Sequence, residues 1–126
     1  MSIQGRLALL TLIAALISGS AQAFERVSDR ARFLETVEGK ALMLTRPFYL
    51  RSAIRVKVET DGDIIGEALG SPVTGDWQWR DGFFCRDLAW GKKDLGPNCQ
   101  LVEVHGNSIR FTSDYGRGDF ADFRIE

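Results

Sequence analysis

Residues 77–90 have the sequence WQWRDGFFCRDLAW, two aromatic-rich runs separated by the pair Asp81-Gly82. Asp-Gly is a favoured pair for the two central residues of a tight hairpin turn. A two-residue turn at this point pairs two antiparallel strands and places Trp77 opposite Arg86. The stretch therefore predicts a β-hairpin whose inner face is mostly aromatic.

A second two-residue turn, Gly106-Asn107, extends this register to the C-terminal part of the chain. It brings apolar residues opposite apolar residues on one face, and Glu103 opposite Arg110 on the other. Placing Cys85 opposite Cys99 joins the two hairpins into one sheet with a single inner face. That face carries the predicted core: Trp77, Trp79, Phe84, Leu88, Trp90, Val102, Val104, Ile109 and Phe111.

Polar side chains interrupt this apolar face and form the candidate ligand-binding site. Arg86 and Gln100 project with the aromatic residues, and a two-residue turn at Asp61-Gly62 adds Glu67 to the inner face. An inward charge is unfavourable unless it is paired or binds something. Two interpretations stay open, a ligand site with Arg86 holding an anion, or an internal contact with Glu67 or Trp77. A three-residue turn at 80–82 would instead direct Arg86 outward.

The candidate site therefore consists of four ligand-binding residues in the mouth of a small barrel: Arg86, Glu67, Trp77 and Gln100.

The rest of the chain predicts an all-β fold with one short N-terminal helix. The helix covers 28–37, with Ser28 as its cap and Gly39 as a left-handed stop. From Lys40 the apolar period changes to two. The fold class is a small antiparallel barrel or sandwich of seven to eight strands, with one domain over 24–126. The expected strands cover 40–45, 52–60, 63–69, 73–80, 83–90, 98–104, 108–113 and 119–125.

The first 23 residues predict a secretory signal peptide. One basic residue, Arg6, precedes the apolar run 7–17, and 21–23 form an Ala-Gln-Ala cleavage site. An uncleaved membrane anchor is the alternative, but the run is shorter than the roughly 20 residues that span a bilayer. We expect a periplasmic or secreted protein that begins at Phe24, with no membrane insertion after cleavage.

The two cysteines, Cys85 and Cys99, both lie in the exported part and predict a disulfide. Closing a loop of about 15 residues stabilises the fold by roughly 3 kcal/mol. A zinc site would need further ligands, and the chain has a single histidine. We expect no metal and no cofactor.

Charge and motifs argue against nucleic acid and against known catalytic arrangements. Residues 24–126 carry 15 basic and 17 acidic side chains, and the basic ones are scattered. The one histidine, His105, borders a predicted turn, and no G-x-S-x-G motif supplies a nucleophilic serine. Asp76 and Asp87 are expected as solvated cross-strand neighbours on the outer face. We predict no catalytic residues.

Three segments resemble a group of small exported proteins from marine alphaproteobacteria that are often automatically labelled dihydrodipicolinate reductase. They are 77–91 (WQWRDGFFCRDLAWG), 94–100 (DLGPNCQ) and 109–114 (IRFTSD). The resemblance covers about residues 40–125 and implies an exported protein, with a reductase as the activity of the label. It carries over no catalytic residues. The chain itself lacks the strand–helix alternation of a nucleotide-binding Rossmann fold.

Together these patterns predict a non-catalytic periplasmic or secreted domain that binds an unknown small molecule or a periplasmic protein. The alternative is an enzyme, as the label of the resembling group implies.

Overall fold

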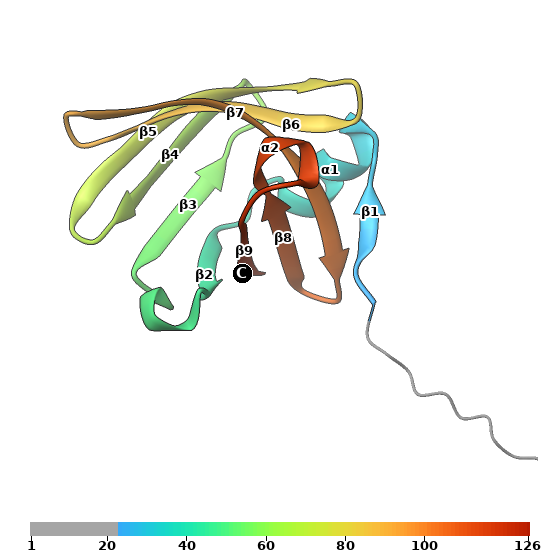
Figure 1. Cartoon of the computed structure of the whole chain (residues 1–126), viewed down its shortest axis with the longest axis horizontal. Coiled ribbons are helices and arrows are strands. Elements are labelled where there is room, and N and C mark those ends of the chain that lie inside the picture. Colours follow the sequence, from blue (N-terminus) through green and yellow to red (C-terminus); the bar gives the residue numbers. More distant parts are fainter. Residues whose placement is uncertain (1–22) are drawn as a thin grey trace, which may run out of the picture.

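The computed structural model describes residues 23–126 (Figure 1). The predicted signal peptide, apart from Ala23, lies outside the described residues. In chain order the elements are β1 (Glu25–Val27), α1 (Arg30–Val37), β2 (Leu42–Arg46), a 3-10 turn (Phe48–Leu50), β3 (Ile54–Val58), β4 (Asp63–Ala68), β5 (Ser71–Arg80), β6 (Phe83–Trp90), β7 (Lys93–His105), β8 (Ser108–Thr112), α2 (Ser113–Gly116) and β9 (Phe120–Ile125).

Strands β2 to β9 form a closed antiparallel barrel. Each strand from β2 to β8 pairs with the next one in the chain, β8 pairs with β9, and β9 returns to β2. The short β1 is an additional strand on the edge of β7, next to the point where β6 begins. The all-β prediction is confirmed, and a barrel replaces the open choice between barrel and sandwich.

The predicted disulfide joins Cys85 of β6 to Cys99 of β7. The two residues are direct cross-strand partners, as the hairpin register predicts. Two-residue turns at Asp81-Gly82 and Gly106-Asn107 are confirmed by the pairs Arg80–Phe83 and His105–Ser108.

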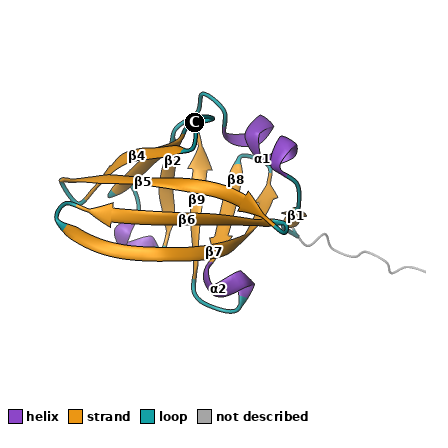
Figure 2. Cartoon of the chain, turned by 90° about the horizontal axis from the view of Figure 1, so that it is seen from above, coloured by secondary structure: helices purple, strands orange, loops and turns teal. Residues whose placement is uncertain are grey.

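Helix α1 plugs one end of the barrel (Figure 2). Its cap is Asp29 and not the predicted Ser28, because the Asp29 carboxylate accepts a hydrogen bond from the Arg32 N–H at 2.8 Å. Phe33 is fully buried, and its ring lies 5.4 Å from that of Trp77 and 5.1 Å from that of Phe84. No helix within residues 23–126 is long and apolar enough to cross a membrane.

The prediction for the β3–β4 turn is wrong by one residue. Val58 pairs with Ile64, so that the turn contains the three residues 60–62. A change of one residue exchanges the two faces of a strand. Ile64 and Ala68 therefore face the core, and Glu67 and Ile65 lie exposed on the outer wall.

Alternation of the strands gives the barrel two different ends. The β3–β4, β5–β6 and β7–β8 turns lie at the end that α1 plugs. The β2–β3, β4–β5 and β6–β7 connections lie at the other end, at the left in Figure 1. We call this second end, formed by residues 46–53, 69–70 and 91–95 with the start of β9, the open end.

We predict that Phe33→Ala lowers the free energy of unfolding by about 3–5 kcal/mol, because it removes a buried aromatic ring among other rings. Ile65→Ala is the matched control on the outer wall, and we expect a change within about 0.5 kcal/mol. Urea denaturation measures both. A Phe33→Ala protein as stable as the control would contradict the plug.

Candidate functional site

The barrel encloses an apolar cavity of about 410 Å³ between the α1 plug and the open end. Phe84 and Phe111 form its floor, since both rings contact Phe33 on their other side. Fifteen of its lining residues are apolar, and two are polar, Arg86 and Gln100. The lining consists of Leu42, Ile54, Val56, Val58, Ile64, Ala68, Leu69, Val73, Phe84, Arg86, Leu88, Trp90, Leu95, Gln100, Phe111, Ala121 and Phe123.

Arg86 is a half-buried cation in this apolar lining. Its Nη1 donates a hydrogen bond to the Gly96 carbonyl at 2.8 Å. None of the four ion pairs among the described residues includes Arg86. Burial lowers the pKa of the guanidinium below its usual range, and the neighbouring Asp87 opposes that shift only in part. A guanidinium has five N–H donors, so most of its hydrogen-bonding capacity is free for a ligand.

The other polar residue of the cavity is Gln100, from the neighbouring strand β7. Gln100 is the cross-strand partner of Phe84, and Arg86 lies two residues further along β6. The two-residue turn at 81–82 therefore places both polar side chains on the inner wall. Their role in ligand binding stays a prediction.

The structure moves the other two candidate residues out of the site. Glu67 is exposed on the outer wall as the cross-strand neighbour of Arg55, so the predicted inward Glu67 and its contact with Arg86 are wrong. Trp77 is only 4% exposed and lies in the packed core, where its indole N–H donates to the Glu59 carbonyl at 2.8 Å. The cation over its ring is Arg30, at 5.4 Å.

Trp90 lines the cavity in place of Trp77. Its indole N–H donates to the Ala68 carbonyl at 2.8 Å, which holds the ring across the end of β4. The sequence pattern places Trp90 on the inner face. The sequence pattern does not show that Trp90 lies at the cavity and away from the plugged end, because that position follows only from the closed barrel.

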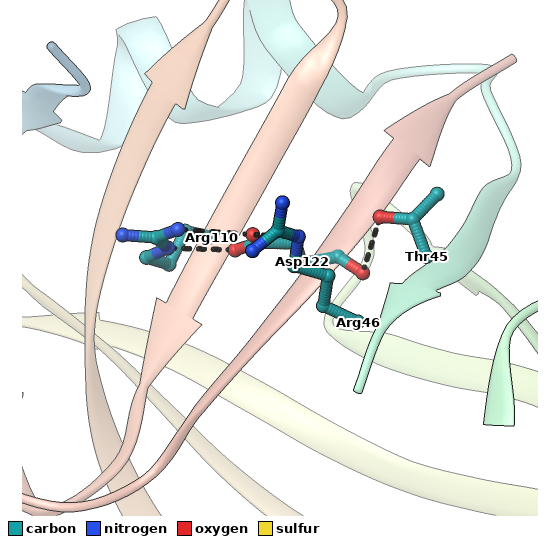
Figure 3. Close-up of polar contacts among 4 residues, drawn as sticks. All are labelled: Thr45, Arg46, Arg110 and Asp122. Carbon is teal, nitrogen blue, oxygen red and sulfur yellow. Dashed lines mark hydrogen bonds and ion pairs between the residues drawn. The ribbon is translucent and has the colours of Figure 1, made fainter. Parts of the chain in front are cut away.

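On the outer wall, the buried Asp122 carboxylate provides the hydrogen-bond acceptors for another arginine, Arg110 (Figure 3). The Asp122 carboxylate is 7% exposed and accepts two hydrogen bonds from Arg110, at 2.7 and 3.0 Å. Arg46 lies 4.0 Å away, and Thr45 donates to the Asp122 backbone carbonyl. This bidentate bond raises the pKa of Arg110. Arg110 is thus a structural residue, whereas Arg86 has no such partner.

The predicted acidic neighbours Asp76 and Asp87 are direct cross-strand partners, and both are exposed on the outer face. They line an open polar groove of about 820 Å³ beside the disulfide. Among residues 23–126 no three His, Cys, Asp or Glu side chains gather as metal ligands would. The lone His105 is exposed at its turn.

No protein family, curated protein or solved structure matches this chain.

We predict that Arg110→Met lowers the free energy of unfolding by about 1–3 kcal/mol, because it leaves the buried Asp122 carboxylate with only the distant Arg46. Arg124→Met, which removes an exposed cation of the same wall, serves as the control. Equal stabilities of the two variants in urea denaturation would contradict a structural role for Arg110.

We predict the opposite sign for Arg86→Met, a rise in the free energy of unfolding of about 1 kcal/mol, because a half-buried cation without a carboxylate partner is replaced by an apolar side chain of similar length. The control is Arg80→Met, on the exposed outer face of β5. Thermal unfolding of the ligand-free proteins measures the difference. A clear loss of stability would show that Arg86 holds the fold together.

Proposed function

We propose that this protein is a non-catalytic binding domain whose barrel holds a small amphipathic molecule, with an apolar body in the cavity and one anionic group on Arg86. The observation that carries the proposal is the half-buried guanidinium, which faces an apolar cavity and has no carboxylate partner among the described residues.

The size and lining of the cavity support a small ligand. Binding sites for small molecules usually measure about 300–1,000 Å³ and combine an apolar wall with a few polar groups. This cavity, at about 410 Å³, has that composition, with Arg86 and Gln100 as its polar groups. A planar guanidinium suits a carboxylate, sulfonate or phosphate, because it donates two parallel hydrogen bonds to such a group.

The energetics point the same way. An unpaired charge in apolar surroundings lowers stability, and functional sites commonly retain such groups. The outer wall of the same barrel pairs Arg110 with a bidentate carboxylate, so the fold is able to pair an arginine where pairing serves stability. The anionic group of a ligand would provide the partner that Arg86 lacks.

Export is part of the proposal. The disulfide is compatible with an oxidising compartment, and the sequence of residues 1–23 has the features of a signal peptide. We expect protein from the periplasm of a Gram-negative host to begin at Phe24 and to contain no free thiol. Intact-mass measurement before and after alkylation tests both points. A chain that keeps Met1, or that takes up two alkyl groups, would contradict export and oxidation.

The binding prediction uses the fluorescent sulfonate 1-anilinonaphthalene-8-sulfonate, displaced by dodecanoate or by uncharged dodecan-1-ol. We expect Arg86→Met to weaken dodecanoate binding by about 10- to 100-fold, as for a lost hydrogen bond between charged groups. Dodecan-1-ol should bind both proteins almost equally, since it has no charge for Arg86 to hold. Arg80→Met is the matched control and should bind dodecanoate like the wild type.

A second variant locates the binding site. Ala121 lines the cavity, and Ala121→Phe should exclude dodecanoate and dodecan-1-ol alike by filling the space. Unchanged dodecanoate affinity in Arg86→Met, or in Ala121→Phe, would reject the cavity as the site. The same titration with NADPH addresses the alternative, since saturable binding of NADPH would favour the reductase that the resemblance implies.

A further inference from the structure

Exposed apolar side chains gather at the open end of the barrel. Of the seven large hydrophobic residues that lie exposed within residues 23–126, five belong to this end: Phe48, Tyr49, Leu69, Leu95 and Phe120. Phe48 and Tyr49 are the most exposed of them, at 67% and 83%. Leu69 and Leu95 also line the cavity, so the apolar surface continues from the rim into the barrel.

The β4–β5 turn has an exposed leucine at a position where the backbone conformation favours asparagine or aspartate. Its central residues are Leu69 and Gly70, and both have positive φ angles, 51° and 84°. Turns of this kind favour Asn or Asp at the first position, because other side chains are strained in the left-handed region. The equivalent turn at the plugged end has Asp81 there, at φ 52°. Leu69 is thus conformationally unfavourable at this turn position, and its apolar side chain lies exposed to solvent.

Basic side chains surround these apolar residues. Arg46 and Arg51 flank the turn that carries Phe48 and Tyr49, Lys92 lies in the β6–β7 turn, and Lys93 is the first residue of β7. All four are exposed, and segments 46–53 and 91–93 contain no acidic residue. Asp94 and Asp119 lie at the margins of this surface. The whole chain has a formal net charge of −1, so the basic loops are a local feature.

Aromatic and leucine side chains beside arginine and lysine suit the boundary of an anionic lipid bilayer. The rings enter the headgroup region, and the cations contact the lipid phosphates. We propose that the open end of this barrel docks on anionic lipid membranes, with Phe48, Tyr49 and Leu69 as its apolar anchors. Docking would present the mouth of the cavity to amphipathic molecules in the bilayer, a consequence that rests on the proposed function.

Co-sedimentation with lipid vesicles tests the docking. The protein is the mature form from the periplasm of an exporting host, with Phe24 verified as its first residue. We expect binding to vesicles of phosphatidylcholine with phosphatidylglycerol, and weaker binding to phosphatidylcholine alone or at high salt. The double variant Phe48→Ser/Tyr49→Ser should bind at least about tenfold more weakly, because it removes two ring anchors. Ile65→Ser, at an exposed apolar residue of the side wall, should bind like the wild type.

Leu69→Asn separates docking from stability. Asparagine is preferred at this turn position, so the melting temperature should rise while vesicle binding falls. No binding to the anionic vesicles, or equal binding by wild type and the double variant, would overturn the proposal. Binding weakened as much by Ile65→Ser would also overturn it, since the contact would then be unspecific.

Dodecanoate titration of the same proteins in solution keeps the two proposals apart. The double variant Phe48→Ser/Tyr49→Ser should retain dodecanoate affinity, because neither residue lines the cavity, and Arg86→Met should retain vesicle binding. A wild-type protein that binds dodecanoate but does not bind the anionic vesicles would contradict the docking proposal alone. A wild-type protein that binds the anionic vesicles but does not bind dodecanoate would contradict the proposed ligand-binding function alone.

Discussion

The two-residue turn at Asp81-Gly82 determines which side chains enter the barrel. Both residues adopt left-handed φ angles, which fit a tight hairpin without an extra residue. Because side chains alternate along a strand, this turn length directs Arg86 inward with the aromatic residues of β5 and β6. Closure of the sheet through β9 then makes that arginine part of the lining of an apolar cavity. One more residue in the turn would exchange the two faces of β6 and move Arg86 to the outer wall together with Phe84 and Leu88.

The barrel combines a packed aromatic half with a half that contains the cavity. At the plugged end, Phe33 contacts the rings of Trp77, Phe84 and Phe111, and these form a packed aromatic core. The disulfide joins β6 to β7, the two strands that supply both polar residues of the cavity. This covalent link restrains the relative position of Arg86 and Gln100, which would reduce the conformational entropy lost when the proposed ligand binds. The packed core and the cavity are thus different parts of one continuous interior.

The fold was largely predictable from the sequence, because tight turns fix both pairing and face. The β5–β6 and β7–β8 registers and the inner position of Arg86 follow from two-residue turns, and the β6–β7 register follows from placing Cys85 opposite Cys99. Glu67 was misplaced because Asp61-Gly62 belongs to a three-residue turn, whose length the two letters do not specify. The lipid-facing surface is not visible as a sequence pattern, because Phe48, Leu69 and Lys92 come from three separate connections that only the closed barrel brings to one end.

The central claim is that the Arg86 guanidinium holds the anionic group of a ligand inside the barrel. Nuclear magnetic resonance of the arginine Nε–H groups, during titration with dodecanoate, tests this contact directly. The account predicts that the Arg86 resonance shifts with the ligand and becomes protected from solvent exchange, while that of Arg80 on the outer face stays unchanged. An Arg86 resonance that does not move while dodecanoate binds would contradict the account and place the ligand elsewhere on the protein.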